Sequence, residues 1–149
     1  AKYSLLRRQA RPGAPPGIDQ AGRLTCPMDD TPDDETLLAQ NDPCSDSWSE
    51  ESFLGRLMEE ALFDEEGYST VEAAMIRAVA EGATFETLGV IIRIIERVTL
   101  MLKRHVDAGD EYGIVNLDDG QVHEIDRRVR YCLVEISLGN APDMSRAEY

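Results

Sequence analysis

The feature that most constrains the fold is segment 85–106, which is apolar around most of a helical circumference. Thr84 precedes it as a capping residue. The apolar positions are Leu88, Val90, Ile91, Ile92, Ile94, Ile95, Val98, Leu100, Met101 and Leu102. A helix that is apolar nearly all round belongs in the middle of a bundle or at an interface. Glutamate and arginine residues interrupt the apolar run, so the segment is not predicted to span a membrane.

Two shorter helices are predicted before this segment. Thr31 and Pro32, followed by three acidic residues, are typical of a helix start, and this helix is expected to end near Gln40. Ser47 begins a capping-box pattern in front of residues 48–63. Six apolar residues in that stretch share one helical face, so a helix over residues 48–63 is expected. They are Phe53, Leu54, Leu57, Met58, Ala61 and Leu62.

A further helix is predicted between Ser69 and Gly82. Ser69 has an acidic residue three positions later, which repeats the capping-box spacing. An apolar stripe follows, and Gly82 is expected to end the helix. Gly67 is then expected to lie between this helix and the one before it.

Segment 114–125 allows two interpretations. An Asp-Asp-Gly turn between two apolar runs would give a short β-hairpin. However, the apolar residues from Val122 to Ile136 are spaced three and four apart, as in a helix. We favour such a helix, capped near Asp118 or Asp119 and ending before Gly139. The hairpin stays open as an alternative.

Together these patterns predict an all-α fold, a small bundle of four to five helices over residues 31–140. The 149 residues are enough for one ordinary domain. Residues 1–30 are expected to form an extended arm, because prolines and glycines are dense there. This arm lacks the apolar run that is typical of a signal peptide. Residues 141–149 are expected to form a loose tail.

Charge is strongly segregated along the chain. Residues 1–25 carry five basic residues and one acidic residue, whereas residues 26–70 carry 14 acidic residues and one base, Arg56. Blocks of like charge commonly serve as solvated or interacting segments. The net charge of −14 disfavours non-specific attraction to nucleic acid and to anionic lipid. Direct nucleic-acid binding and membrane binding are therefore not expected.

No recognisable catalytic or metal-binding motif is present. Cys26, Cys44 and Cys132 contain no C-x-x-C pair, and His105 and His123 do not lie at ligand spacing from one another. We therefore expect no cofactor, no metal and no enzymatic activity. Three widely spaced cysteines do not suit a disulfide framework, which favours a reducing compartment such as the cytoplasm, or the interior of an assembled particle.

These observations favour a non-enzymatic interaction or assembly protein. In this hypothesis the arm docks on neighbouring subunits of a larger complex, for example a viral particle or a secretion machine. Arginine and aromatic residues often dominate binding energy at interfaces. The expected anchors in the arm are Tyr3, Leu5, Leu6, Arg7, Arg8 and Arg11. Segment 85–106 additionally suggests self-association, since four or five helices need not cover it fully.

The alternative hypothesis is an acidic inhibitor or regulator that imitates nucleic acid and occupies a basic groove on a partner protein. Its candidate surface consists of Asp29, Asp30, Asp33 and Asp34. Acidic residues near helix starts also favour the helix dipole, which is a structural explanation for part of this charge. A DNA-binding role for the helices on either side of Gly82 is least favoured, because the second helix presents Glu86 and Thr87 where basic residues are needed.

Overall fold

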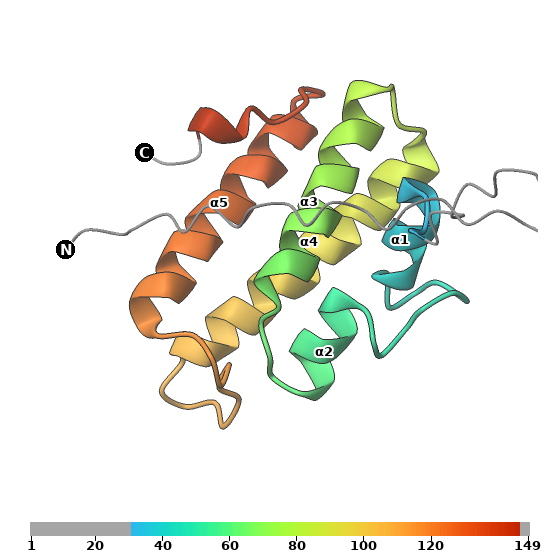
Figure 1. The fold of residues 1–149 in the computed structure, drawn as a ribbon. Coiled ribbons are helices and arrows are strands. Elements are labelled where there is room, and N and C mark those ends of the chain that lie inside the picture. Colours follow the sequence, from blue (N-terminus) through green and yellow to red (C-terminus); the bar gives the residue numbers. More distant parts are fainter. Residues whose placement is uncertain (1–30, 147–149) are drawn as a thin grey trace, which may run out of the picture. The chain divides into compact units, whose positions relative to one another are not determined.

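The computed structural model describes residues 31–146, and all regular structure within them is helical (Figure 1). The helices are α1 (Asp34–Gln40), α2 (Phe53–Glu59), α3 (Glu65–Ala80), α4 (Phe85–Val106) and α5 (Asp119–Ser137), followed by a short 3-10 turn, η1 (Met144–Arg146). The prediction of a small all-α bundle is confirmed. The alternative of a β-hairpin at residues 114–125 is wrong.

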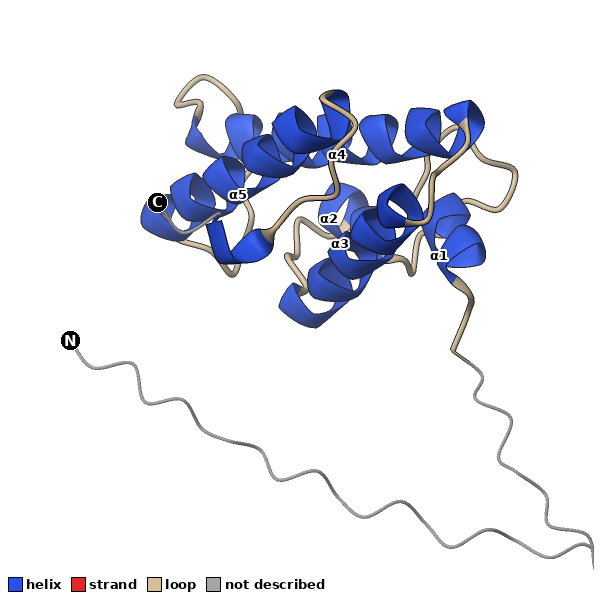
Figure 2. Cartoon of the chain, turned by 90° about the horizontal axis from the view of Figure 1, so that it is seen from above, coloured by secondary structure: helices blue, strands red, loops and turns tan. Residues whose placement is uncertain are grey.

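Helix α4 is the central element, because it packs against each of the other four α-helices. Figures 1 and 2 show α3 and α5 on the same side of α4. The core side of α4 consists of Ile91, Ile94, Ile95, Val98, Met101 and Leu102, all almost fully buried. One side of α4 is therefore buried in the bundle, as expected for a largely apolar helix, while its other side keeps exposed apolar residues. Among the helices of residues 31–146, none is both long and apolar enough to cross a bilayer.

Helix α1 starts later than the sequence pattern indicated. Its N-cap is Asp33, whose carboxylate accepts a hydrogen bond from the backbone N–H of Thr36 at 2.7 Å. The predicted start at Thr31 and Pro32 is therefore wrong. Aspartate caps as well as threonine does, and here the competing cap lies two residues further along the chain.

Helix α2 is shorter than predicted. Ser52, rather than Ser47, caps it by accepting a hydrogen bond from Gly55 N at 3.1 Å, and the residues before Ser52 form successive turns. At the other end, Ala61 adopts a left-handed φ of 52°, so the chain has left the helix before Phe63. The apolar spacing of residues 48–63 thus reflects burial of several separate turns rather than one helix.

Helix α3 begins at Glu65 and not at Ser69. Asp64 is the N-cap, and its carboxylate accepts a hydrogen bond from Gly67 N at 3.1 Å. Gly67 consequently lies in the first turn of α3, where an added Cβ would lie 3.0 Å from the carboxylate of Asp64 and 3.3 Å from Cβ of Phe53. The capping-box spacing at Ser69 has no structural role as a helix start.

The starts of α4 and α5 are confirmed. Thr84 caps α4 through the backbone N–H of Thr87 at 3.1 Å. Asp118 caps α5, and the side chain of Gln121 accepts a hydrogen bond from the backbone N–H of Asp118 in return. Gly82, with φ of 86°, follows the end of α3 as expected.

Residues 114–117 belong to the link between α4 and α5, and the hydrogen bonds of this link explain why they form no strand. Its polar groups bond to neighbouring helices and turns, not to a partner strand. Asn116 bonds both the N–H and the C=O of Phe63, at 2.9 and 2.8 Å, and the hydroxyl of Tyr112 donates to Leu57 O at 2.5 Å. Ile114 N donates to Nδ1 of His105 at 2.8 Å. The link is therefore anchored to α2, to the start of α3 and to α4.

Candidate functional site

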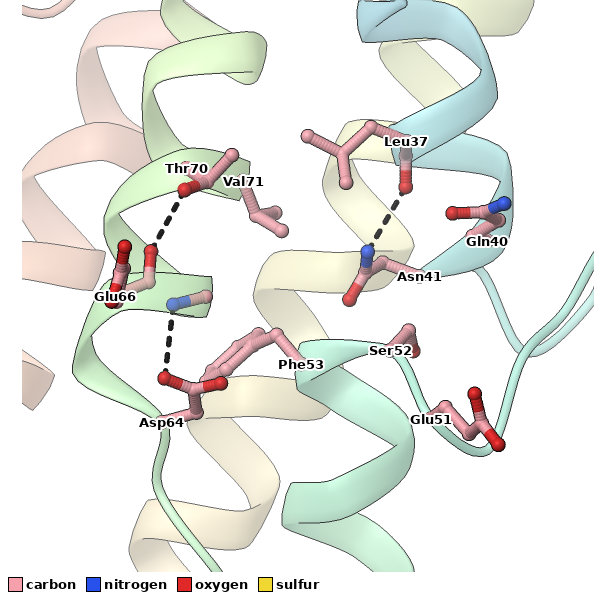
Figure 3. Close-up of a pocket in the computed structure, with 11 residues that line it drawn as sticks. Leu37, Gln40, Asn41, Glu51, Ser52, Phe53, Asp64, Glu66, Thr70 and Val71 are labelled. Atoms are coloured by element: carbon pink, nitrogen blue, oxygen red, sulfur yellow. Dashed lines mark hydrogen bonds between the residues drawn. The ribbon is translucent and has the colours of Figure 1, made fainter. Parts of the chain in front are cut away.

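A groove lies between the end of α1, the start of α2 and the first turns of α3 (Figure 3), with a volume of about 370 Å³. Its apolar lining includes the buried side chains of Phe53 and Val71. Its acidic lining consists of Glu51, Asp64 and Glu66. Such a groove combines an apolar base with negative charge, which suits a basic peptide segment better than an acidic one.

Two close contacts fix the wall of this groove. The side chain of Asn41, only 1% exposed as a residue, donates to Leu37 O and accepts from Leu54 N, both at 2.9 Å, so it joins α1 to α2 (Figure 3 shows the first of these bonds). Gly55 lies against the preceding turn, where an added Cβ would be 2.4 Å from Ser49 O. The groove is thus shaped by buried hydrogen bonding and by close backbone packing.

The three acidic residues of the groove differ in what they contact. Asp64 caps α3 and accepts a hydrogen bond from Arg56 at 3.1 Å, so its charge is already engaged. Glu51 and Glu66 are exposed and form no ion pair among residues 31–146. These two carboxylates are available to an approaching cation.

A second hollow, of about 670 Å³, lies between α1 and the turn that joins α3 to α4. Its acidic residues are Asp34, Glu35, Asp42, Glu81 and Glu86. Asp34 is bound by Arg77 through two hydrogen bonds of 2.8 and 2.7 Å, and Asp42 is bound by Arg93, with a shortest distance of 2.6 Å. The surface around α1 therefore presents acidic hollows on two sides.

Asp33 and Asp34, the two described residues of the predicted acidic surface, both have partners within the chain. The N–H of Thr36 holds the pKa of Asp33 below its ordinary value, and hydrogen bonds from Arg77 do the same for Asp34. Asp29 and Asp30 lie outside the described residues, as do Tyr3, Leu5, Leu6, Arg7, Arg8 and Arg11. Within the described acidic surface, Glu35, Glu51 and Glu66 are better candidates for contact with a partner than Asp33 and Asp34.

Asp42 shows how strongly this region depends on ion pairing. Its side chain is 2% exposed, and burial alone would raise its pKa. Hydrogen bonds from Arg93 and from Cys44 N outweigh burial, so the pKa of Asp42 lies below its ordinary value. This carboxylate anchors the segment after α1 onto α4.

The other buried polar cluster joins α3 to α5. Arg128 donates to both carboxylate oxygens of Glu72, at 2.8 and 2.5 Å, while Tyr68 and Cys132 lie close to this pair. Burial, followed by the negative charge of Glu72, raises the pKa of Tyr68 far above its usual range and that of Cys132 to about 12. Both groups are therefore protonated at neutral pH. The cluster suits a structural role better than nucleophilic or acid-base chemistry.

Neither histidine is placed as a metal ligand. Both ring nitrogens of His105 face neighbours: Nδ1 accepts from Ile114 N, and Nε2 lies 3.4 Å from the carboxylate of Asp119. Across residues 31–146, no group of three or more histidine, cysteine, aspartate or glutamate side chains could hold a metal ion. His105 instead fastens the link between α4 and α5.

The side of α4 that points away from the core retains large apolar side chains. Phe85, Ile92, Leu100 and Val106 are 94%, 36%, 42% and 42% exposed, and Glu96 and Lys103 lie on the same side. We call these six residues the outer face of α4. Helical positions at these intervals fall within one sector, which points away from buried Ile94 and borders buried Ile95 at Val106. Figure 2 shows α4 along one edge of the bundle, with the other helices on its opposite side.

Comparison with known proteins identifies no relative: no family model, curated protein or solved structure matches the chain. The candidate surfaces therefore rest on the geometry and charge described above.

The long-range ion pairs of the two buried carboxylates, Asp42 and Glu72, were not predicted from the sequence. Asp42 and Arg93 are 51 residues apart, and Glu72 and Arg128 are 56 residues apart, so no local spacing marks either pair. One signal was available for Glu72, because it falls within the apolar stripe of α3, next to buried Val71. A charged residue in such a stripe needs a partner.

Proposed function

We propose that this protein is a non-enzymatic subunit of a larger protein complex. In this proposal residues 1–30 dock on a neighbouring subunit, with the anchors named above, and the helical domain provides the folded body. The complex would be an assembled particle or machine, and the outer face of α4 would be one of its protein interfaces.

The observation that carries this proposal is the outer face of α4. Single apolar residues are common on protein surfaces, but four of them along one side of the central helix form a row. Exposed apolar surface of this kind, accompanied by charged residues, is typical of a protein interface. The almost completely exposed ring of Phe85 has no partner in residues 31–146 that would bury it.

The charge distribution supports docking by the basic segment. Residues 1–25 carry five bases and one acid, whereas the hollows beside α1 are lined by carboxylates. A neighbouring subunit with a comparable acidic surface would attract the segment and orient it. Affinity would come mainly from Tyr3, Leu5 and Leu6, because exposed charge pairs contribute little after screening by salt.

Deletion of residues 1–25 tests this function. We expect the complex to be lost while helical content and the melting temperature of the domain stay within error, because the helical core lies in residues 34–137. A finer variant reverses three charges, Arg7→Glu, Arg8→Glu and Arg11→Glu, and should weaken assembly, because attraction to an acidic surface becomes repulsion. A complex of unchanged mass and composition after the deletion would rule out the proposed role of the arm.

A reducing compartment, such as the cytoplasm, accompanies this proposal. The described cysteines, Cys44 and Cys132, are free thiols, and burial keeps Cys132 protonated. A thiol such as exposed Cys44 persists most readily where disulfides are kept reduced.

The alternative function is an acidic regulator that binds a basic groove on another protein. Its support is the set of exposed carboxylates around α1 that take part in no ion pair among residues 31–146, including Glu35, Glu51 and Glu66. Their joint replacement by glutamine should weaken such binding at low ionic strength without loss of folding. Unchanged affinity at low salt would exclude the regulator, because its contacts depend on charge.

A further inference from the structure

The outer face of α4 carries one acid and one base in an arrangement that complements itself. Glu96 and Lys103 are seven residues apart, so they point the same way and lie about 10.5 Å apart along the helix. Neither forms an ion pair within residues 31–146, and both are exposed. Leu100 lies between them, with Ile92 and Val106 beyond them.

We propose that the occupant of this face is a second copy of the same chain, with the two α4 helices antiparallel about a two-fold axis. The inference builds on the proposed function, in which the outer face of α4 is a protein interface, and it names the partner and the register. In a pair related by a two-fold axis, contacts are reciprocal. If residue i of one copy contacts residue j of the other, then residue j of the first copy contacts residue i of the second.

The charges of Glu96 and Lys103 favour the antiparallel over the parallel orientation of the two α4 helices. A parallel pair in register would place Glu96 against Glu96 and Lys103 against Lys103, which is unfavourable. An antiparallel pair centred between residues 99 and 100 places Glu96 of each copy opposite Lys103 of the other. Two identical ion pairs then form, one on each side of the two-fold axis.

The same register also aligns the apolar side chains. It brings Leu100 close to Leu100 of the other copy at the centre, and Ile92 opposite Val106 towards each end. Residues opposite one another in an antiparallel pair have numbers with a constant sum. The sums for these pairs range from 198 to 200, so the pairs agree on one register within two residues, or about 3 Å along the axis. One register therefore satisfies both charged residues and three of the four apolar residues of the outer face, while the position opposite Phe85 lies beyond the end of α4.

Of the three arginines on the flank of this face, Arg97 is exposed and forms no ion pair within residues 31–146. Arg93 and Arg104 lie beside the outer face, but Asp42 and Asp110 neutralise them within the same chain. Helix α4 as a whole carries four lysine and arginine residues against two glutamates, unlike the acidic surface around α1. Two copies of a chain with net charge −14 repel least where they approach through α4.

The first test is the mass of the full chain as a function of concentration, measured by sedimentation equilibrium at about 150 mM salt, where the Debye length is about 8 Å. A single helix pair buries less surface than a standard interface, so a dimer with Kd in the micromolar range is expected. A chain that stays monomeric at several hundred micromolar would overturn the proposal.

Charge exchange then tests the register. Glu96→Lys and Lys103→Glu should each raise Kd by about tenfold, because each change makes two repulsive pairs. The double variant Glu96→Lys with Lys103→Glu should return Kd to within about threefold of the original. Glu111→Lys, the same charge change at an exposed position in the link after α4, is the control. Single variants that leave Kd unchanged would exclude this pairing even if a dimer forms.

Cross-linking tests the centre of the interface. In a background with Cys26→Ser and Cys44→Ser, Leu100→Cys should give a disulfide-linked dimer on mild oxidation, because residue 100 meets itself across the two-fold axis. Glu111→Cys in the same background should give no disulfide-linked dimer. Cross-linking of Glu111→Cys but not of Leu100→Cys would contradict the inference.

These outcomes are separable from those that test residues 1–30. Loss of the larger complex on deletion of residues 1–25, together with an unchanged α4 dimer, would support both proposals. A larger complex that depends on residues 1–25 but contains no α4 dimer would overturn only the present inference. An α4 dimer with a complex indifferent to the deletion would overturn only the role of the arm.

Discussion

The region around α1 and α2, residues 33–64, is built differently from the region of α4 and α5, residues 84–137. The first contains two helices of seven residues, joined by consecutive turns and held by buried polar contacts. The second contains helices of 22 and 19 residues, each begun by a side-chain cap and buried along one stripe. Regular apolar periodicity suffices to specify long helices, whereas short ones depend on particular long-range contacts.

The largest effect is expected at Gly55, where the α1–α2 region is most tightly packed. Gly55→Ala would place a Cβ 2.4 to 2.6 Å from backbone atoms of Ser49 and Glu50, which cannot move without disrupting the turn. We expect a loss of about 3 kcal/mol in the free energy of unfolding, measured with urea. Gly113→Ala is the matched control, since nothing lies within 4 Å of its added Cβ. Equal stability of the two variants would show that this packing does not hold the region.

Asn41 should give the next largest effect. Asn41→Ala removes the acceptor for Leu54 N and the donor for Leu37 O in a buried site. Leaving these backbone groups unsatisfied should cost about 2 kcal/mol, together with local loss of hydrogen-exchange protection in α1 and α2. Asn140→Ala, which removes an exposed bond to Glu135, should change stability by less than about 0.5 kcal/mol. If hydrogen-exchange protection falls equally in α5, the region of α1 and α2 does not open independently of the region of α4 and α5.

The ion pair of Asp42 with Arg93 should make the stability of the α1–α2 region depend on pH. The folded state holds the pKa of Asp42 below its ordinary value, so ionised Asp42 stabilises the protein at any pH above that ordinary value. Asp42→Asn should therefore lose about 1.5 kcal/mol at pH 5 to 7, and this difference should shrink as the pH falls below about 4. Urea unfolding of both proteins across this range measures it, with Asp46→Asn at an exposed position as control. A difference that persists unchanged at the lowest pH would contradict the assigned pKa direction.

The smallest loss of stability is expected on removal of a helix cap, and it distinguishes a residue that caps a helix from one that only has the sequence pattern of a cap. Thr84→Ala removes the side chain that accepts from Thr87 N, and should cost about 1 kcal/mol in thermal or urea unfolding. Ser47→Ala and Ser69→Ala change residues that have the sequence pattern of caps but do not begin helices in the structure. Both should stay within about 0.5 kcal/mol of the original protein. A comparable loss in either would mean that the sequence pattern is correct and the helix start is not.

The capping residues also explain how much of the fold could be predicted. Thr84 and Asp118 precede uninterrupted apolar stripes, so cap and periodicity agree, and both helix starts were placed correctly. Ahead of α1, α2 and α3, several Ser, Thr and Asp residues compete for the same role. The choice among them depends on contacts such as the hydrogen bond from Leu54 N to the side chain of Asn41, 13 residues away, which no local pattern contains.

The candidate surfaces were predicted only in part. The excess of acids and the apolar outer face of α4 follow from composition and periodicity. Composition and periodicity do not show which acids are available to a partner. Arg77 and Arg93 bind Asp34 and Asp42 from positions 43 and 51 residues away. Burial of Glu72 by Arg128 is equally a consequence of tertiary packing. Charge counts therefore locate an acidic region, and the folded structure decides which of its carboxylates can meet a partner.

The mass and composition of the native complex test the central claim most directly. Native mass spectrometry of material recovered with the full chain, and with a chain that lacks residues 1–25, would compare the two assemblies. The account predicts a multi-subunit particle for the full chain and loss of its neighbouring subunits after the deletion, with the helical domain still folded. Recovery of the full chain as a lone monomer, or of the same particle from both chains, would contradict it.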